Sequence, residues 1–308
     1  MKILVTGGAG YIGSMLVPEL LKAGHEVCVY DSLLFGGNSM LPHFRNDNFS
    51  MIVGDIRDES LLKDVVKGKD VIIHLAAIVG YPACEKDHKI TNEVNYIATK
   101  NLVDMLDDNQ VILFGSTGSN YGAVEGVCTE ETSLNPLSLY GVTKTEAERY
   151  IMKNCKAVAY RFATAFGLSP RLRLDLLVND FTNKAINEKY IVVYESHFMR
   201  TFIHVYDIAR SFMFALDNLD DMVGSVYNVG SDNMNYSKRK ICEVIKEKTD
   251  YYLHLADIGK DADQRDYVVS YDKISSLGFN TTIGIEEGIE ELVNGIRVIK
   301  VQNPYANV

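Results

Sequence analysis

The sequence lacks the features that would place a protein in a membrane, on nucleic acid or around a metal ion. No apolar run approaches the roughly 20 residues that a membrane-spanning helix needs. The formal net charge is −10, and no basic stripe exists that could neutralise the phosphates of a nucleic acid. The seven histidines and five cysteines form no H-x-x-x-H or C-x-x-C pair, so no metal site is predicted.

Cysteine usage also argues against a secreted protein. The five cysteines are odd in number and widely spaced, which is typical of reduced thiols rather than of disulfides. Only a short apolar run follows Lys2, and it predicts no signal peptide. With 308 residues, 47% of them apolar and 23% charged, the chain has the composition of a globular protein of one large or two closely joined domains. We expect a cytoplasmic protein without a membrane or nucleic-acid partner.

What the sequence does contain is a glycine-rich segment, GGAGYIG at residues 7–13, between a short apolar run and an apolar helical pattern. This order predicts the phosphate-binding turn of a dinucleotide-binding βαβ unit, with the pyrophosphate at the N-terminus of the helix. Gly7 allows the tight turn, Gly10 lets the backbone approach the pyrophosphate, and Gly13 lets the helix pack on the strand. With these glycines, Tyr11 and Ile12 of the same turn are predicted to line the cofactor site.

Asp31 indicates which dinucleotide is bound. It ends the second apolar run, 18 residues after Gly13. A carboxylate at that place can accept hydrogen bonds from both ribose hydroxyls, and it would repel a 2′-phosphate. The predicted cofactor is therefore NAD rather than NADP, and the alternative is that Asp31 only ends a strand at a turn.

Short β-branched runs alternate with helical patterns through the first half of the chain. The alternation predicts parallel strands joined by right-handed helical crossovers, and therefore an α/β fold with a Rossmann-type doubly wound sheet. The predicted strands cover residues 2–6, 26–31, 50–53, 70–74, 110–114 and 157–161, and the helices between them cover 12–24, 59–67, 92–107 and 140–155.

Beyond about residue 165 the alternation becomes irregular, and no linker separates the two halves. A helix at 207–219 and a strand at 225–229 are predicted to return to the sheet. The remaining residues are expected to form a smaller α/β substrate lobe over the carboxyl ends of the strands, where open sheets bind their ligands. The predicted dinucleotide-binding domain is 1–165 with 201–230, and the predicted substrate lobe is 166–200 with 231–308.

Three tyrosines are followed four residues later by a lysine, a spacing that places both side chains on one helical face. A tyrosine with a pKa near 10 needs about 4 kcal/mol of stabilisation to act as a base at neutral pH, which a lysine cation and a nicotinamide ring can supply. Tyr140 and Lys144 open the helix after the fifth predicted strand, whereas the pairs at 96/100 and 236/240 do not. Tyr140 is therefore the predicted base.

These motifs together resemble the extended short-chain dehydrogenase/reductase superfamily, in particular its NAD-dependent nucleotide-sugar epimerase/dehydratase family. The glycine spacing G-x-x-G-x-x-G fits that branch, and the segment 116–122, STGSNYG, resembles its S-[ST]-x-x-x-Y-G stretch. The resemblance implies that Thr117 hydrogen-bonds the reacting hydroxyl and completes a catalytic triad with Tyr140 and Lys144. The alternative for Thr117 is a loop hydroxyl that caps its own backbone.

Other segments resemble the family along the whole chain: GDIR at 54–57, HLAA at 74–77 and RTFIHVYD at 200–207. A guanidinium group suits a diphosphate, although each arginine alone could equally be a solvated charge. Further cofactor contacts are implied for Asp55, Ile56, Leu75, Ala76, Ala77 and Asn95. Substrate contacts are implied for Tyr81, Cys84, Thr164, Arg171, Arg173, Asn179, Arg200 and Arg265, with a buried inert thiol as the alternative for Cys84.

Departures from the family pattern narrow the expected reaction. Gly118 and Ser119 stand where 4,6-dehydratases of the family carry Asp-Glu, so elimination of water is not expected. Thr164 replaces the asparagine of the R-x-x-N motif that epimerases usually have. The run 171–181 resembles bacterial enzymes that oxidise GDP-linked heptoses for surface polysaccharide.

The resemblance implies NAD-dependent oxidation at C4 of a nucleotide-linked sugar. A 4-epimerase is favoured on family base rate, and a 4-dehydrogenase that releases the keto product or a 4-keto-sugar reductase remains open. A non-catalytic regulator that senses NAD is disfavoured because Tyr140 and Lys144 are both intact. The helices at 92–107 and 140–155 are those through which the superfamily commonly dimerises, so a homodimer is expected by resemblance.

Overall fold

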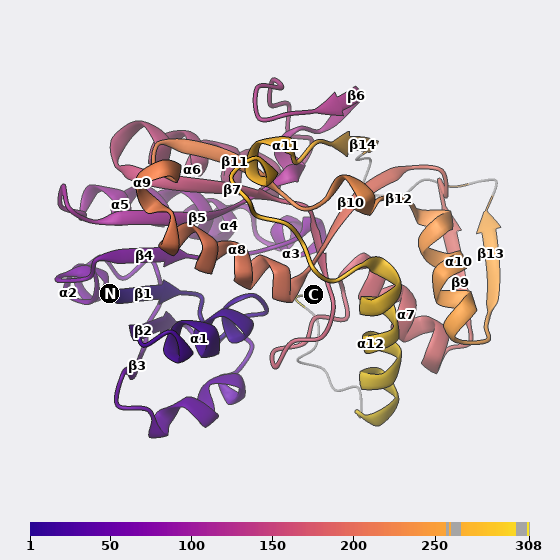
Figure 1. Ribbon diagram of the computed structural model, residues 1–308, viewed down its shortest axis with the longest axis horizontal. Coiled ribbons are helices and arrows are strands. Elements are labelled where there is room, and N and C mark those ends of the chain that lie inside the picture. The colour runs from indigo at the N-terminus through magenta and orange to yellow at the C-terminus, as the bar shows by residue number, and fades with distance from the viewer. Residues whose placement is uncertain (257–258, 260–265, 300–306, 308) are drawn as a thin grey trace.

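The computed structural model of the chain describes residues 1–256, 259, 266–299 and 307 (Figure 1). Within these residues the central feature is a parallel sheet of seven strands, in the order β11-β7-β5-β4-β1-β2-β3. Its strands are β1 (Lys2–Thr6), β2 (Glu26–Asp31), β3 (Phe49–Val53), β4 (Val71–His74), β5 (Val111–Thr117), β7 (Lys156–Phe162) and β11 (Ser225–Val229).

The strand order reverses beside β1. The chain runs outward from β1 to β2 and β3, and then returns to place β4 on the other side of β1. Loops that leave two such strands diverge and open a crevice at their carboxyl ends, which is where open α/β sheets bind ligands. The glycine-rich turn leaves β1 at this point, and the segment Leu75–Ala77 leaves β4.

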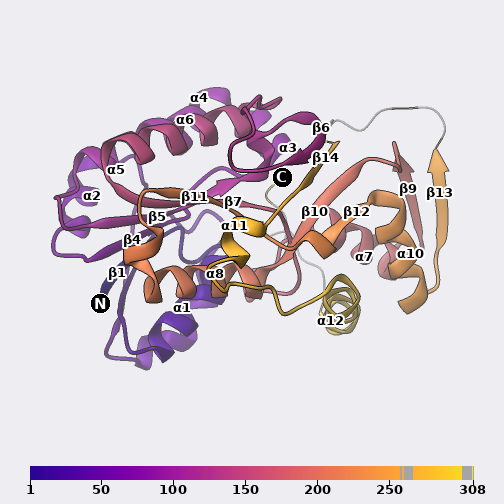
Figure 2. The ribbon, with the colours of Figure 1, turned by 45° about the horizontal axis from the view of Figure 1, so that its top comes forward.

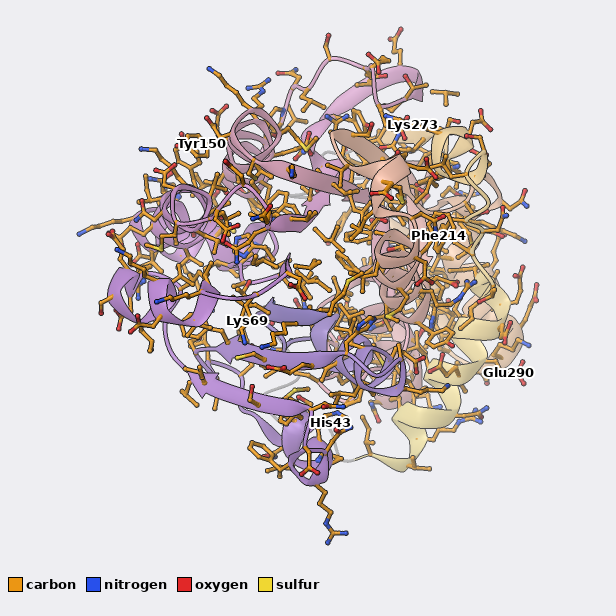
Figure 3. All side chains as sticks on the ribbon, turned by 60° about the vertical axis from the view of Figure 1, so that its left-hand side comes forward. His43, Lys69, Tyr150, Phe214, Lys273 and Glu290 are labelled. Carbon is orange, nitrogen blue, oxygen red and sulfur yellow. The ribbon has the colours of Figure 1, made fainter. Side chains whose placement is uncertain are left out.

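Helices cover both faces of the sheet because successive strand residues point to opposite sides. Ile3 and Val5 of β1 share a hydrophobic core with α1 and α8, whereas Leu4 shares a different core with α2, α5 and α6. Phe214 on α8 and Tyr150 on α6 accordingly lie on opposite sides of the sheet in Figure 3. These helices are α1 (Gly13–Lys22), α2 (Glu59–Val66), α5 (Ala98–Asp104), α6 (Leu139–Asn154) and α8 (Val205–Asp217).

A third hydrophobic core lies beyond the sheet, to the right in Figures 1 and 2. It is formed by three helices and by a parallel pair of strands, and β10 connects it with the strand ends of the large sheet. Its elements are α7 (Leu177–Asn187), β9 (Tyr190–Tyr194), β10 (Met199–His204), α10 (Lys238–Lys248), β13 (Tyr252–Ala256) and α12 (Ile285–Val298). The apolar side chains of these elements pack on one another rather than on the large sheet.

Short elements complete the described chain. β10 pairs with β8 (Thr164–Phe166) and β12 (Asn235–Ser237), and β14 (Asp266–Val269) pairs with β6 (Ala123–Cys128). The short helices are α3 (Tyr81–Lys86), α4 (His88–Asn92), α9 (Leu219–Met222) and α11 (Asp272–Ser275), with a π-helical segment Glu93–Ile97 and 3₁₀ turns at 38–45, 118–120 and 232–234. None of the helices in the described residues is long and apolar enough to cross a bilayer.

The predicted doubly wound sheet is confirmed, and two boundaries were wrong. β5 continues to Thr117 instead of ending at residue 114, because Gly115, Ser116 and Thr117 pair with β7. The helix predicted at 92–107 is divided: α4 precedes a π-helical segment, and α5 ends at Asp104. β11 lies at the edge of the sheet, beside β7, at the residues predicted to return there.

Candidate active site

The glycine-rich turn is packed too tightly for side chains. Gly7 has a φ of +70°, and a Cβ on it would lie 2.7 Å from the backbone nitrogen of Ala76. A Cβ on Gly13 would lie 2.4 Å from the carbonyl oxygen of Gly8. No side chain caps the N-terminus of α1, although the backbone N–H groups of Ser14 and Met15 donate to the carbonyls of Gly10 and Ile12 at 2.9 and 3.1 Å. The positive end of the helix dipole is therefore open to an anion.

Asp31 lies against this turn at the end of β2. Its carboxylate accepts hydrogen bonds from the backbone N–H of Ala9, at 3.0 Å, and of Leu33, at 2.8 Å. Burial raises the pKa of Asp31, and the two backbone donors and the positive charge of Arg171 oppose that rise. Since each carboxylate oxygen has a second lone pair, the group can still accept from ribose hydroxyls.

His74 and Asn95 stabilise, through hydrogen bonds, the segments that line the crevice. The His74 ring bonds Thr6 Oγ1 at 2.7 Å and Thr99 Oγ1 at 2.9 Å, and burial lowers the pKa of His74 to about 3. The Asn95 side chain accepts from the backbone N–H of Ile78 at 2.8 Å and donates to its carbonyl at 2.9 Å. The buried amide of Asn95 thus fixes the segment that leaves β4, and its predicted contact with the cofactor stays a prediction.

The predicted base and its lysine lie at the start of α6. The Ser138 hydroxyl caps this helix by accepting from the N–H of Gly141 at 3.2 Å. Tyr140 follows in the first turn and is half-buried, whereas Lys144 is only 3% exposed. The Lys144 Nζ lies 3.9 Å from the ring centroid of Phe114, the residue of β5 that pairs with His74 at the carboxyl end of β4. Burial lowers the pKa of Lys144 to about 7, and the carboxylate of Glu148 opposes that effect.

Thr117 is the last residue of β5 and is buried. Its Oγ1 accepts from the backbone N–H of Ser119 at 3.1 Å and donates to the Ser119 hydroxyl at 3.1 Å. This is the backbone-capping arrangement that the sequence left open as an alternative. Capping does not exclude a contact with substrate, since a hydroxyl oxygen has two lone pairs, so the catalytic role of Thr117 stays a prediction.

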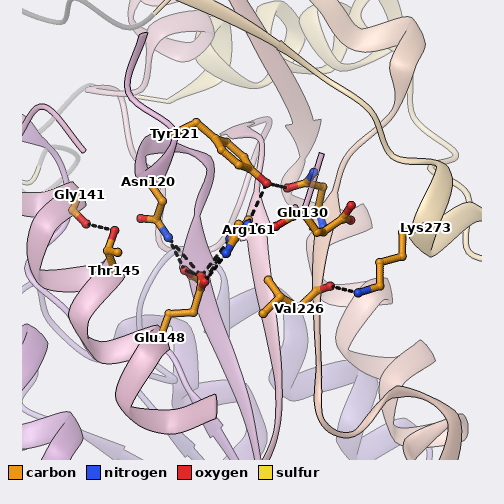
Figure 4. A network of polar contacts seen from close by, with 11 residues as sticks. Asn120, Tyr121, Glu130, Gly141, Thr145, Glu148, Arg161, Val226 and Lys273 are labelled. Atoms are coloured by element: carbon orange, nitrogen blue, oxygen red, sulfur yellow. Dashed lines mark hydrogen bonds and ion pairs between the residues drawn. The ribbon is translucent and has the colours of Figure 1, made fainter. Parts of the chain in front are cut away.

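Sequence reasoning missed Glu148, a buried carboxylate that joins these elements (Figure 4). Arg161 on β7 donates to it through Nη2 at 2.6 Å and Nε at 3.1 Å. Ser116 donates at 2.5 Å and Asn120 at 3.1 Å. Such a group is stable in the interior only when it is paired and hydrogen-bonded. The signal was present, because Glu148 lies four residues after Lys144 on the same helical face.

Arg161 extends the same network toward the strand edge. Its Nη1 donates to the Tyr121 hydroxyl at 3.1 Å, and that hydroxyl donates to Asn228 Oδ1 at 2.6 Å. The guanidinium of the R-x-x-N-like motif is thus held entirely by the protein. Thr164, three residues later, is half-buried, and its hydroxyl has no hydrogen-bond partner among the described residues.

The predicted substrate arginines differ in what surrounds them. Arg173 forms an ion pair with Asp175, and its carbonyl accepts from the Asn179 side chain at 2.8 Å. Arg200 is 1% exposed and donates to the carbonyl of Met199 at 3.0 Å. Arg171 is also buried, but its Nε and Nη2 atoms have no hydrogen-bond acceptor among the described residues. Arg265 lies outside the described residues.

Four other predicted contacts occupy different places. Tyr81 is the first residue of α3 and is exposed, so it remains available to a ligand. Cys84 is fully buried, its thiol donates to the Ile78 carbonyl at 3.4 Å, and burial raises its pKa to about 11. It was proposed as a substrate-lining thiol, and the structure gives the buried, inert alternative. The Asp55 carboxylate accepts a hydrogen bond from Arg57 at 2.7 Å, and the neighbouring Ile56 is buried.

The comparisons with known proteins agree with this geometry. A model of the NAD dependent epimerase/dehydratase family matches residues 3–230. The chain belongs to this family. Like other members, it is an NAD-dependent enzyme, as the sequence predicted. No group of three His, Cys, Asp or Glu in the described part of the chain could hold a metal ion.

Members of the family with different reactions are similarly related to the chain. A UDP-glucose 4-epimerase of Corynebacterium glutamicum is 28% identical, over 81% of this chain and 80% of that protein. A dTDP-glucose 4,6-dehydratase of Streptomyces niveus is also 28% identical, over 96% of this chain and 93% of that protein. The structure of a UDP-glucuronic acid 4-epimerase from Bacillus cereus, in complex with UDP-glucuronic acid and NAD, is 26% identical with a TM-score of 0.86, covering 96% and 99% of the two chains.

The residues present fit NAD. The turn at Gly7 and Gly13 has no space for a Cβ, which is what a backbone cradle for a pyrophosphate requires. Asp31 places a carboxylate beside that cradle, and the buried Arg171 side chain has nitrogen atoms without a partner. The resemblance to enzymes acting on GDP-linked heptoses is not tested by these relatives and stays a prediction.

Proposed function

We propose that the protein oxidises C4 of a nucleotide-linked sugar and acts as a nucleotide-sugar 4-epimerase. One observation supports this most directly: Tyr140 and Lys144 lie one turn apart on α6, and the Lys144 amine is buried against Phe114. Phe114 is level with the carboxyl ends of β4 and β1, and the glycine-rich turn leaves β1 there. A relative at 28% identity and a solved structure at 26% identity are both 4-epimerases. NAD, when bound, supplies the acceptor and later the donor of a hydride.

The chain's own residues then handle the proton and the orientation. We propose that the Tyr140 phenolate takes the proton of the sugar 4-hydroxyl as the C4–H bond breaks and a carbonyl forms. A positive charge on Lys144 stabilises that phenolate, because opposite charges in a water-poor site interact strongly. Thr117 orients the reacting hydroxyl, and arginine side chains hold the diphosphate of the substrate. The residues proposed for the substrate are Tyr81, Thr164, Arg173, Asn179, Arg200 and Arg265.

The structure gives a reason to separate this protein from 4,6-dehydratases. A Cβ on Gly118 would lie 3.2 Å from both the Phe162 carbonyl oxygen and the Tyr267 hydroxyl. There is therefore little room at position 118 for the aspartate that 4,6-dehydratases of the family carry there. Ser119, the next residue, has a buried hydroxyl that accepts from Thr117. Neither residue can supply the acid and base that elimination of water needs.

The proposal is tested by supplying the purified protein with UDP-, dTDP-, GDP- and CDP-linked sugars. Absorbance of reduced nicotinamide is followed together with product stereochemistry by NMR. A 4-epimerase converts one sugar into its C4 epimer and releases no reduced cofactor. Stoichiometric reduced cofactor with a 4-keto product would contradict the epimerase and identify the 4-dehydrogenase instead.

Tyr140→Phe removes only the proton acceptor. We expect turnover to fall by at least about 100-fold, the usual contribution of a positioned base, while NAD affinity stays within about twofold. Initial rates and a calorimetric titration with NAD measure the two quantities. Turnover retained in Tyr140→Phe would exclude the mechanism. The homodimer, the cytoplasmic location and the domain limits stay predictions.

A further inference from the structure

Arg171 carries a buried guanidinium group, part of which has no hydrogen-bond acceptor in the described residues. It is 7% exposed, and within the described residues its Nε and Nη2 atoms are buried and have no hydrogen-bond acceptor. An arginine cannot avoid the cost of this environment by losing its proton, because its pKa is too high. A buried guanidinium is retained where something satisfies it, so the unfilled donors point to a ligand that is an anion.

The neighbours of Arg171 lie on the cofactor side of the crevice. Its backbone N–H donates to the Ser14 hydroxyl, in the first turn of α1, at 3.3 Å. Ser169 donates to the carbonyl of Tyr11 at 2.7 Å, and the Tyr11 hydroxyl donates to the carbonyl of Gly167 at 2.7 Å. The segment 167–171 is thus fastened to the glycine-rich turn and to the uncapped end of α1.

The guanidinium itself is held over an aromatic ring of the loop that follows Asp31. Its central carbon lies 4.2 Å from the ring centroid of Phe35, a cation–π contact that fixes the plane of the group and uses none of its N–H donors. Of the charged side chains that act on it, Arg173 and Asp175 are paired with each other. The carboxylate of Asp31 accepts from the backbone N–H groups of Ala9 and Leu33, and no ion pair joins it to Arg171 in the described residues.

We propose that Arg171 is a cofactor residue, which reaches from beyond the sheet to bind the pyrophosphate of NAD opposite the N-terminus of α1. The sequence had assigned it to the substrate. The guanidinium matches two oxygens of a phosphate, and the helix end supplies N–H groups from the other side. The inference rests on the NAD binding of the proposed function and does not depend on which sugar is turned over.

This geometry has a consequence for cofactor retention. With Arg171 on its pyrophosphate, NAD would be held both by the glycine-rich turn and by the segment 167–171, and its release would be slowed. An enzyme that oxidises and then reduces the same sugar gains from such retention, because the reduced cofactor must stay for the second half of the reaction.

The test compares Arg171→Ala with wild-type protein stripped of nucleotide, using calorimetric titration with NAD, ADP-ribose, adenosine and UDP. Loss of a charge-assisted hydrogen bond predicts that the Kd for NAD and for ADP-ribose rises about 10- to 100-fold. Adenosine has no phosphate, so its Kd should stay within about twofold, as should that for UDP. Arg171→Lys should recover part of the affinity, and Arg149→Ala, an exposed arginine on α6, serves as the control.

Each outcome decides the inference separately from the sugar reaction. Unchanged affinity for ADP-ribose would overturn it, and so would weakened UDP binding with NAD affinity intact, which would return Arg171 to the substrate. A loss of adenosine binding equal to that of ADP-ribose would also overturn it, because the phosphate would then be irrelevant. The absence of epimerisation in wild-type protein would contradict the proposed function but leave these binding constants interpretable.

Discussion

Replacing Lys144 by methionine should make the cofactor-free protein more stable and at the same time inactive. The Lys144 side chain is 3% exposed and lies over the ring of Phe114. The carboxylate that could neutralise it, Glu148, is already paired with Arg161 at 2.6 Å. Burial therefore dominates and lowers the pKa of Lys144 from 10.5 to about 7, so the folded protein holds this proton less tightly than the unfolded chain.

The size of the effect follows from that difference in pKa. The interval between 10.5 and about 7 corresponds to about 5 kcal/mol of free energy. Below pH 7 the lysine is charged in both states, and folding carries the full cost. Above pH 7 the folded Lys144 is neutral while the unfolded one keeps its proton, so stability rises by about 1.4 kcal/mol per pH unit until the unfolded lysine also titrates near its ordinary value.

Lys144→Met removes this group and its pH dependence. We expect the variant to unfold at higher urea concentration than wild type at pH 6, and its advantage in free energy to shrink by about 3 kcal/mol at pH 9. Circular dichroism of nucleotide-free protein at both pH values measures this, and Lys153→Met, an exposed position on the same helix, is the control. An advantage that is equal at pH 6 and pH 9 would refute the reasoning, as would turnover that survives the substitution.

Two further substitutions test other parts of the site. Glu148→Gln leaves the buried Arg161 without its carboxylate and should destabilise the protein by about 3–5 kcal/mol; urea unfolding measures this, and a loss below about 1 kcal/mol would mean that the network is not structural. Asp31→Ala should weaken NAD binding by at least about tenfold and reduce discrimination against NADP, because the carboxylate beside Ala9 that would repel a 2′-phosphate is lost. Titrations with both dinucleotides measure this, and an unchanged preference would show that the carboxylate does not read the ribose.

The large sheet could be predicted from the sequence because its information is local. The inner strands are short runs of β-branched and apolar residues, buried on both faces between crossover helices. The error at β5 shows the limit of that reading. Gly115 is a weak strand former and ends the apolar run, and residues 115–117 are extended because β7 offers each of them a backbone partner.

The short strands outside the sheet could not be predicted for a related reason. β14 pairs with β6, so that Asp266 stands opposite Ala123 and Val269 opposite Cys128. Neither strand has a long apolar pattern of its own. Pairing between segments about 140 residues apart depends on the packing of the whole fold, which a local pattern does not carry.

The candidate site divides in the same way. Tyr140 and Lys144 follow from helical spacing and from their place after the fifth strand, both of which are local. The surroundings of a charged side chain are not local, because they include residues that lie far away in the sequence. Thr117 shows this on a small scale, since its hydroxyl caps the backbone of Ser119, and nothing in the segment tells whether a substrate hydroxyl joins it.

The arginines show why tertiary structure decides function here. Arg161, Arg171 and Arg173 have the same chemistry and lie within 13 residues of one another, so the sequence gives no ground for separating them. In the fold, Arg161 forms an ion pair with Glu148, and Arg173 forms one with Asp175. Arg171 is equally buried and lacks a carboxylate within ion-pair distance in the described chain. Since an unpaired buried charge costs several kcal/mol, Arg171 is expected to meet a ligand anion.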